Sequence, residues 1–493
     1  MEERYITSVD LGTSKIAVAV ARVEGDDVQM IYFKETPSEG VRNSHVFNPQ
    51  KVSTPLRMAL DEAERDLGIK VNQAVVGLPR YYVRQEMATA KFPRTNADES
   101  ISSEEINALK SDAIDSYPLE DNNKEVIFGA VAQSFSVEDC FQTAENDIVG
   151  MVSPELEGNF KAFIGSKRSS TNIDMVFNNI GVAIADKIFT PDAVARAVLT
   201  PEERENGVAL IELGAGVTSV TIYKNDILRH YAAIPFGGNT ITGDIKIECG
   251  ISTALAENIK LAFGACQPDR LASMSEKIIQ INYAENAMEK QLPVKYLSEI
   301  ISCRESEIID AMLYEIEQSG YSDELRSGVV ITGGGANITN CGNLIKSMSG
   351  YNVREGYPLH LFTATGCSGV SETEASTSVG LILAAKKNTM LNCTKDAPRR
   401  LTAAEDITSE QEEEVTTVEE KVEQKVEQKN ETQSDGTLFG DGHLDRNSTK
   451  TKVTKNGGDK GEKKKGKFIF TWNRILDKVQ GQMDSLYEGM EDE

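Results

Sequence analysis

The distribution of apolar residues predicts alternating strands and helices over residues 5–386, with two hairpins of the same form. The first runs from Tyr5 to Val20, where two β-branched, apolar stretches flank a short polar turn. The second runs from Val208 to Tyr223 and repeats the order of apolar strand, acidic residue, glycine-containing turn and apolar strand. Apolar strands joined by such turns are typical of β-hairpins. Both stretches therefore predict hairpins with polar chemistry at the tip.

The first turn suits a phosphate group. Gly12 has no Cβ and lets the backbone approach an oxyanion, while the hydroxyls of Thr13 and Ser14 can donate hydrogen bonds and Lys15 adds positive charge. Asp10 could hold a hydrated metal ion. An Asp-Leu-Gly turn is also common in ordinary hairpins, so this turn alone leaves a purely structural role equally open.

A third glycine cluster strengthens the functional interpretation. A buried strand is predicted from Val329 to Thr332, and it leads directly into Gly333-Gly334-Gly335. Two hairpins about two hundred residues apart, followed by this turn, predict two similar lobes that face each other across a phosphate.

The remaining pattern predicts an α/β protein with an insertion. A helix from about Ser53 that stops near Gly68, followed by a buried strand at 74–79, continues the first lobe. Residues 80–165 differ in texture and predict a small α+β subdomain. It contains a capped helix at 102–116 and strands at 87–92, 125–137, 147–152 and 160–164.

The second lobe is predicted to carry a mainly helical part. Helices are expected from Ser252 to Phe263, which holds Glu257 and Lys260 one turn apart, and over most of 266–320. The apolar stripe of the latter region is interpreted as ordinary core. Residues 375–385 predict the closing helix of the folded part.

Composition excludes several classes of protein. The chain has 493 residues, 40% of them hydrophobic, and a net charge of −25, which argues against a nucleic-acid binder. The seven scattered cysteines show no CxxC spacing and are interpreted as free thiols in a reducing compartment. We expect no signal peptide, because the charged N-terminus leads almost at once into a strand. No run approaches the roughly 20 apolar residues that cross a bilayer, so a membrane contact would be peripheral.

The C-terminal region changes character twice. Glu, Gln, Thr and Ser dominate residues 403–447, which predicts a disordered, self-repelling linker. Basic residues then precede an amphipathic helical pattern with Trp472 on its apolar face, which is typical of helices at a bilayer interface. Docking on a partner or on the folded body remains the alternative. The candidate membrane-binding residues are Lys464, Lys465, Phe468, Trp472, Ile475, Leu476 and Val479.

The ordered set of hairpin, hairpin, Gly-Gly-Gly turn and closing Ser376-Thr377-Ser378-Val379-Gly380 helix resembles the actin, sugar-kinase and heat-shock-chaperone superfamily. Ser8 to Lys15, Ile234 to Asn239, the insert and the tail resemble the FtsA family of bacterial cell-division proteins in particular. The resemblance covers about residues 5–386, and the tail by its architecture.

The resemblance implies an actin-like, two-lobed α/β ATPase fold with an inserted α+β subdomain and a disordered tail. The implied domains are a first lobe (1–79 and 166–200), the insert (80–165), a second lobe (201–250 and 326–388), a mainly helical subdomain (251–325), an acidic linker (389–459) and a membrane-targeting helix (460–493).

The resemblance also implies ATP and Mg²⁺ as cofactors, with Asp10 and Glu212 near the metal and Glu212 as the catalytic candidate. The implied nucleotide-binding residues are Asp10, Gly12, Thr13, Ser14, Lys15, Gly214, Gly216, Thr218, Glu257, Lys260, Gly333, Gly334 and Gly335. The family often has Asp, Gly and Asp where this chain has Glu212, Ala215 and Ser219. Because in-line hydrolysis depends on positioning, we expect ATP binding with slow or negligible turnover.

By the same resemblance, the chain polymerises on the inner face of the cytoplasmic membrane, binds the C-terminal peptide of the tubulin-like FtsZ and recruits later division proteins. Lys295 and Arg304 are the cationic candidates for the peptide site. The alternative is a small-molecule kinase of the same superfamily, which would need a polar substrate pocket and has no use for the tail. A chaperone is disfavoured, because the C-terminal composition cannot form a peptide-binding domain.

Overall fold

The computed structural model describes residues 3–395, apart from 139, 283–288 and 359–360. Most of the predicted linker and the whole predicted terminal helix, with its seven candidate membrane-binding residues, lie outside the described residues. Within the described part of the chain, no helix is both long and apolar enough to cross a membrane.

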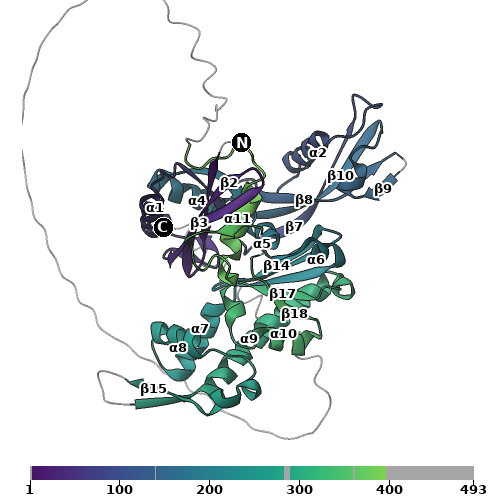
Figure 1. Cartoon of the computed structure of the whole chain (residues 1–493). Helices are drawn as coiled ribbons and strands as arrows, with labels where there is room; N and C mark the ends of the chain where they lie inside the picture. Colours follow the sequence, from purple (N-terminus) through teal and green to yellow (C-terminus); the bar gives the residue numbers. More distant parts are fainter. Residues whose placement is uncertain (1–2, 139, 283–288, 359–360, 396–493) are drawn as a thin grey trace, which may run out of the picture. The chain divides into compact units, whose positions relative to one another are not determined.

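The first lobe is built on a six-stranded sheet of order β11-β6-β1-β2-β3-β19 (Figure 1). Its strands are β1 (Arg4–Leu11), β2 (Lys15–Glu24), β3 (Asp27–Pro37), β6 (Gln73–Gly77), β11 (Ala183–Ile188) and β19 (Thr363–Ala364). The helices are α1 (Pro49–Leu67) and α4 (Lys167–Ile180), and the small hairpin of β4 (Val41–Arg42) and β5 (His45–Val46) precedes α1. Asn48 caps the start of α1, and Gly68 ends it in the left-handed conformation.

The second lobe repeats the centre of this plan. β12 (Val208–Leu213) pairs antiparallel with β13 (Thr218–Lys224) and parallel with β17 (Val329–Thr332), as β1 pairs with β2 and β6. The sheet order is β14-β13-β12-β17-β18, with β14 (Ile227–Ile234) and β18 (Val353–Glu355) at the edges. The predicted hairpins are thus confirmed, each at the centre of a separate sheet.

The insert is a four-stranded sheet of order β7-β10-β8-β9 with α2 packed on it (Figure 1). Its elements are β7 (Arg84–Pro93), α2 (Ser103–Asp115), β8 (Glu125–Val137), β9 (Cys140–Thr143), α3 (Glu145–Ile148) and β10 (Glu155–Ser166). The Ser102 side chain accepts from the Glu105 backbone and Glu105 reaches back, so the capped helix is confirmed. The predicted strand at 147–152 is wrong. The short helix α3 ends at Ile148, a turn follows at Val149 and Gly150, and Val152 forms only an isolated bridge, to Ser100.

Two further helices, α5 (Thr190–Val198) and α11 (Ser376–Ala385), pack against each other, and α11 also packs on the first sheet. The second sheet and the mainly helical part carry α6 (Pro201–Asn206), α7 (Gly238–Cys249), α8 (Thr253–Phe263), α9 (Val294–Gln318) and α10 (Cys341–Ser349). The stretch expected to be mostly helical also holds a hairpin of β15 (Ile278–Asn282) and β16 (Glu289–Pro293). The apolar stripe of α9 is core as interpreted, since Leu297, Ile301, Ile308, Ile309, Met312 and Ile316 are buried.

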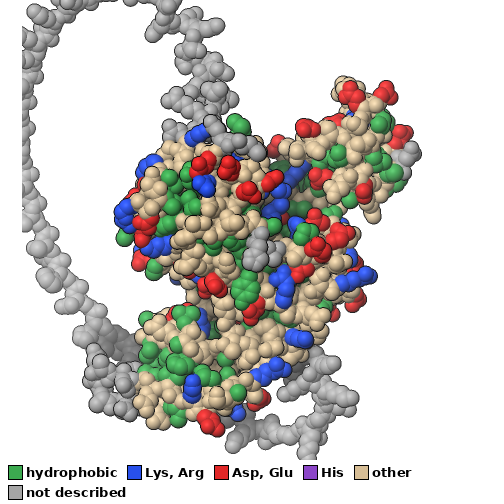
Figure 2. Space-filling model, viewed as in Figure 1, with side chains coloured by type: hydrophobic (Ala, Val, Ile, Leu, Met, Phe, Trp, Pro, Cys, Tyr) green, Lys and Arg blue, Asp and Glu red, His purple; other side chains and the backbone are tan. Residues whose placement is uncertain are grey.

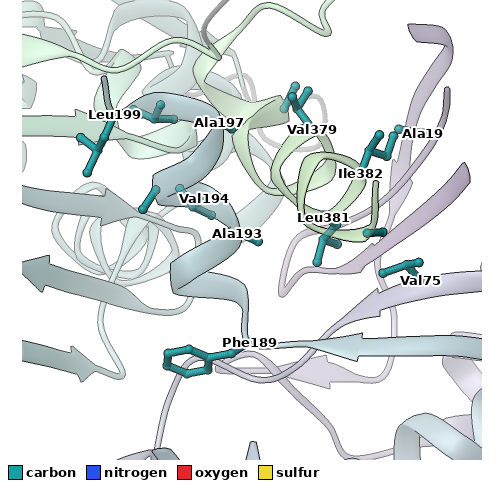
Figure 3. Close-up of a cluster of buried hydrophobic side chains, with 14 of the residues drawn as sticks. Ala19, Val75, Phe189, Ala193, Val194, Ala197, Leu199, Val379, Leu381 and Ile382 are labelled. Atoms are coloured by element: carbon teal, nitrogen blue, oxygen red, sulfur yellow. The ribbon is translucent and has the colours of Figure 1, made fainter. Parts of the chain in front are cut away.

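One apolar cluster joins the lobes. It packs α5 against α11 and includes residues of β1, β2, β12 and β17 (Figure 3). Figure 3 shows Ala193 and Val194 of α5 beside Val379, Leu381 and Ile382 of α11. The insert adds polar contacts to the edge strand β14: Gln133 donates to the Leu228 carbonyl (2.9 Å), and Gln85 accepts from the Tyr231 amide (3.2 Å). These contacts cover an edge that would otherwise expose backbone groups.

Candidate functional site

The two predicted phosphate turns have the same local geometry. A Cβ on Gly12 would lie 2.6 Å from the Lys15 carbonyl oxygen, and a Cβ on Gly214 would lie 2.6 Å from the Val217 carbonyl oxygen. Both turns fold back so tightly after their strands that only glycine fits at the first position. Backbone N–H groups exposed in such turns are ready donors for an anion.

The turns meet across the interface of the two lobes. A Cβ on Gly216 would lie 2.8 Å from the Thr13 side chain, and the Thr13 hydroxyl accepts from the Ser44 amide at 3.1 Å. Thr13 thus contacts the second lobe on one side and the β4–β5 hairpin on the other.

A pocket of about 530 Å³ opens between these elements, which is within the usual range for a small-molecule or cofactor site. Its lining includes every predicted nucleotide-binding residue except Thr218, together with Glu212. Thr218 lies at the start of β13, paired with Leu213 and Ile234, and its side chain is fully buried. The structure therefore does not bring Thr218 to the pocket, because its place in the sheet directs it into the packed interior.

One wall of the pocket is a polar network between α7 and α8. Lys260 is buried and donates to the Gly238 carbonyl and the Thr242 hydroxyl, both at 2.9 Å, and lies 2.8 Å from Glu257. Thr242 in turn donates to Glu257. This network orders the start of α7 next to the pocket. Helix N-termini and fixed lysines favour negatively charged ligands.

Lys15 forms ion pairs with two carboxylates. Its ammonium lies 2.5 Å from Glu35 and 3.8 Å from Glu374. Burial raises the pKa of Glu35, and Lys15 opposes that shift. Glu374 precedes α11 and lies beside Gly334, where a Cβ would be 3.6 Å from its carboxylate. Lys15 and the Gly-Gly-Gly turn are therefore linked through Glu374.

The pocket also holds a buried ion pair that sequence reasoning missed. The Arg80 guanidinium lies 3.0 Å from Glu212 and donates to the Thr377 hydroxyl at 2.5 Å. Thr377 donates to Glu212 at 3.3 Å. Burial raises the pKa of Glu212, and the negative charge of Asp10 adds to the shift, whereas Arg80 favours the carboxylate. An arginine after a buried strand is common in proteins, so its sequence position carried no signal.

These residues fit the two expected cofactors unequally. Glycine turns, hydroxyls, Lys15 and buried Lys260 form a donor set that suits a polyphosphate, with the Gly333-Gly334-Gly335 turn at the same pocket. Magnesium requires free carboxylate oxygens and several waters in octahedral geometry. Arg80 and Thr377 both contact Oε1 of Glu212, so the expected pair of Asp10 and Glu212 would offer a metal only Asp10 and the second oxygen of Glu212, next to a fixed positive charge.

Lys295 and Arg304 lie on α9, away from this pocket. Lys295 is exposed in the first turn. Arg304 is already bound, with Asp244 at 2.6 Å and Glu307 at 2.6 Å. The two predicted cations therefore have different surroundings on the same helix.

The family model and the related sequences carry the same description. The family model "Cell division protein FtsA" matches residues 209–380. The cell division protein FtsA of Neisseria meningitidis is 27% identical over 398 residues, which span 78% of this chain and 91% of that protein. The FtsA of Bacillus subtilis is 28% identical over 387 residues, which span 78% of this chain and 84% of that protein.

Among solved structures, a chain of the "PilM-PilN type IV pilus biogenesis complex" matches with a TM-score of 0.54 and 13% identity, over 77% of this chain and 98% of that chain. That likeness concerns the fold alone. With its duplicated lobes, the α/β fold is actin-like, as predicted. Taken with the family model and the relatives, this makes the chain similar to the FtsA cell division proteins over most of its length.

Proposed function

We propose that this chain is an ATP-binding, polymer-forming division protein that anchors the FtsZ ring to the inner face of the cytoplasmic membrane and recruits later division proteins. The observation that carries the proposal is the interlobe pocket, where both glycine turns, the Gly-Gly-Gly turn and Lys260 converge. Nucleotide bound there would contact both lobes and bias their relative orientation. That is how binding in a pocket can control self-association.

The pocket supports binding better than turnover. Hydrolysis of ATP needs a positioned water next to the terminal phosphate. Glu212, the expected catalytic carboxylate, is instead paired with Arg80. The carboxylate of Asp192 on α5 does not orient a water either, because it pairs with Arg196 at 2.8 Å and accepts from the Tyr223 hydroxyl at 2.8 Å. ATP would supply the binding energy that closes the lobes, and we expect slow or negligible hydrolysis.

Self-association and FtsZ binding are assigned to exposed surfaces of α7, α8 and the helical part, which reach the rim of the pocket at Leu261. Ile247 of α7 and Leu261 of α8 are each 74% exposed, and Figure 2 shows hydrophobic side chains gathered over this region. Exposed apolar patches mark protein contact sites. We place the FtsZ C-terminal peptide on the neighbouring helical part, with Lys295 as the available cation.

The membrane contact is assigned to the basic and amphipathic segment at 460–493, which lies outside the described residues. Its apolar residues and lysines would bind an anionic surface peripherally. The alternative remains a small-molecule kinase. Robust phosphoryl transfer from ATP to small alcohols would support that activity and contradict the membrane-anchoring function.

The test is co-sedimentation of the purified full chain with anionic vesicles, with and without ATP, against a chain ending at Asp459. We expect only the full chain to pellet with lipid, less so at high salt, and to form ATP-dependent polymers on the vesicles. The matched variant Trp472→Ala should lose lipid binding while still binding nucleotide. If the full and shortened chains pellet equally, the anchoring function is wrong.

A further inference from the structure

Arg80 is placed by contacts from three parts of the molecule. It follows β6 at the point where the chain leaves the first lobe for the insert. Its backbone amide donates to the Ser44 hydroxyl at 3.0 Å, and its carbonyl accepts from the Tyr231 hydroxyl. The guanidinium is therefore directed into the pocket by the β4–β5 hairpin on one side and the second lobe on the other.

The guanidinium occupies the position where a cation would be expected. Its side chain is 13% exposed, it contacts Glu212, and the negative charges of Glu212 and Asp10 both stabilise it. These are the two carboxylates expected to hold a metal. Within the described part of the chain its Nε atom is buried without a hydrogen-bond partner, so the protein does not satisfy every donor of this guanidinium.

We propose that Arg80 is the resident cation of the phosphate site and that it makes nucleotide binding by this chain largely independent of a divalent metal. Its guanidinium neutralises Glu212 and offers its remaining N–H groups to the terminal phosphate of the nucleotide. The inference rests on the proposed nucleotide binding and adds to it a specific ligand and a specific ionic requirement.

The physical reason is competition for one carboxylate. Arginine binds carboxylate and phosphate oxygens through a planar set of donors and keeps its charge when buried. Mg²⁺ keeps several waters and needs free oxygen ligands around it. As long as Arg80 and Thr377 hold Oε1 of Glu212, a metal would find only Asp10 and the second oxygen of Glu212, and the adjacent guanidinium would repel it.

The experiment measures the affinity of the full chain for fluorescent ADP by anisotropy, in excess magnesium chloride and in excess EDTA. For the unaltered chain we expect the Kd in the two solutions to agree within about threefold. For Arg80→Gln we expect the Kd in EDTA to rise about tenfold or more, since a charge-assisted hydrogen bond is lost. Magnesium should recover part of that loss, because Glu212 is then free.

Two further variants separate this effect from loss of folding. Arg80→Gln combined with Glu212→Gln leaves no unpaired buried charge, so this double variant should melt near the temperature of the unaltered chain. In EDTA it should bind ADP as weakly as Arg80→Gln does. Magnesium should not recover its affinity. Arg196→Gln removes a partly buried arginine that pairs with Asp192 outside the pocket and should leave the Kd unchanged in both solutions.

The outcomes distinguish the two proposals. If the unaltered chain binds ADP in magnesium but loses more than about tenfold in EDTA, and Arg80→Gln shows the same ratio, the role of Arg80 is wrong while nucleotide binding stands. If Arg80→Gln binds as tightly as the unaltered chain in EDTA, the role of Arg80 is also wrong. If the unaltered chain binds ADP in neither solution, both proposals fail.

Discussion

Gly380 of α11 lies directly against the backbone of Ala193 of α5, and a Cβ on Gly380 would be 2.1 Å from the Ala193 carbonyl oxygen. These two helices form the centre of the apolar cluster that joins the lobes (Figure 3). The absence of a side chain at one position thus sets how closely the lobes are held together.

Gly380→Ala should destabilise the protein by about 1–3 kcal/mol, because the new methyl group must push two packed helices apart. Urea unfolding followed by circular dichroism measures the change. Gly243→Ala is the matched control, since Gly243 lies within α7 and a Cβ there meets nothing within 4 Å. We expect that variant to gain about 0.5–1 kcal/mol from helix propensity. Equal effects of the two variants on stability would contradict the close contact between α5 and α11 at Gly380.

His45 should make the protein less stable in mild acid. It is buried, and its Nδ1 lies 2.7 Å from the Ser169 hydroxyl. Burial lowers its pKa from 6.5 to about 4, and a hydrogen bond to the Tyr81 backbone opposes that shift. Between pH 4 and pH 6.5 His45 binds a proton in the unfolded chain but stays neutral in the folded chain. Stability therefore falls as the pH is lowered from 6.5 to 4, by on the order of 3 kcal/mol.

His45→Asn should remove that loss. Unfolding free energies from urea titrations at several pH values between about 4 and 8 would show the variant below the unaltered chain at neutral pH and closer to it, or above it, in acid. A constant difference between the two chains across this range would show that His45 does not stay neutral in the fold.

Glu305 should act in the opposite direction. Its side chain is buried on α9 and accepts from the Cys341 thiol at 3.5 Å; burial raises its pKa to about 7, while that hydrogen bond and the charge of Lys260 oppose the shift. From 4.5 to 7 the folded chain retains a proton that the unfolded chain has lost, so stability falls as the pH rises through this range.

Glu305→Gln keeps the shape without the titration. We expect it to be more stable than the unaltered chain above pH 7, by no more than about 3 kcal/mol, and nearly equal to it near pH 4.5. Thermal unfolding at matched pH values measures the difference. The stability of Glu305→Gln relative to the unaltered chain should be higher at pH 8 than at pH 5. The opposite order would show that Glu305 is not a neutral buried carboxyl group.

The two candidate cations for the FtsZ peptide should respond differently to removal. Lys295 is exposed, whereas Arg304 is engaged by Asp244 and Glu307. Lys295→Ala should weaken binding of the peptide a few-fold without lowering the melting temperature, as expected for a solvent-exposed charge. Arg304→Ala should lower the melting temperature, and Asp244→Asn should match it. Fluorescence titration with the labelled peptide provides the test. A stronger peptide effect of Arg304→Ala, at unchanged stability, would reverse the assignment.

Local patterns in the sequence predicted the elements whose formation depends on local chemistry. Hairpins around Gly12 and Gly214 follow from alternating strand patterns joined by turns that only glycine can make. The capped helix beginning at Ser103 was predicted because Ser102 and Glu105, three residues apart, can each cap the other's backbone N–H group. The strand predicted at 147–152 was wrong because α3 ends at Ile148 and the chain then turns at Gly150, which has a positive φ.

The tertiary structure decided which polar groups meet. Thr13 lies against Gly216, and Arg80 against Glu212, across more than a hundred residues of chain. Thr218 was placed in the interior by strand pairing that no local pattern reveals. The sequence by itself determined the turns and the list of phosphate-binding candidates, because these depend on neighbouring residues. The charge balance of the site depends on distances between separate lobes, and only the fold sets those distances.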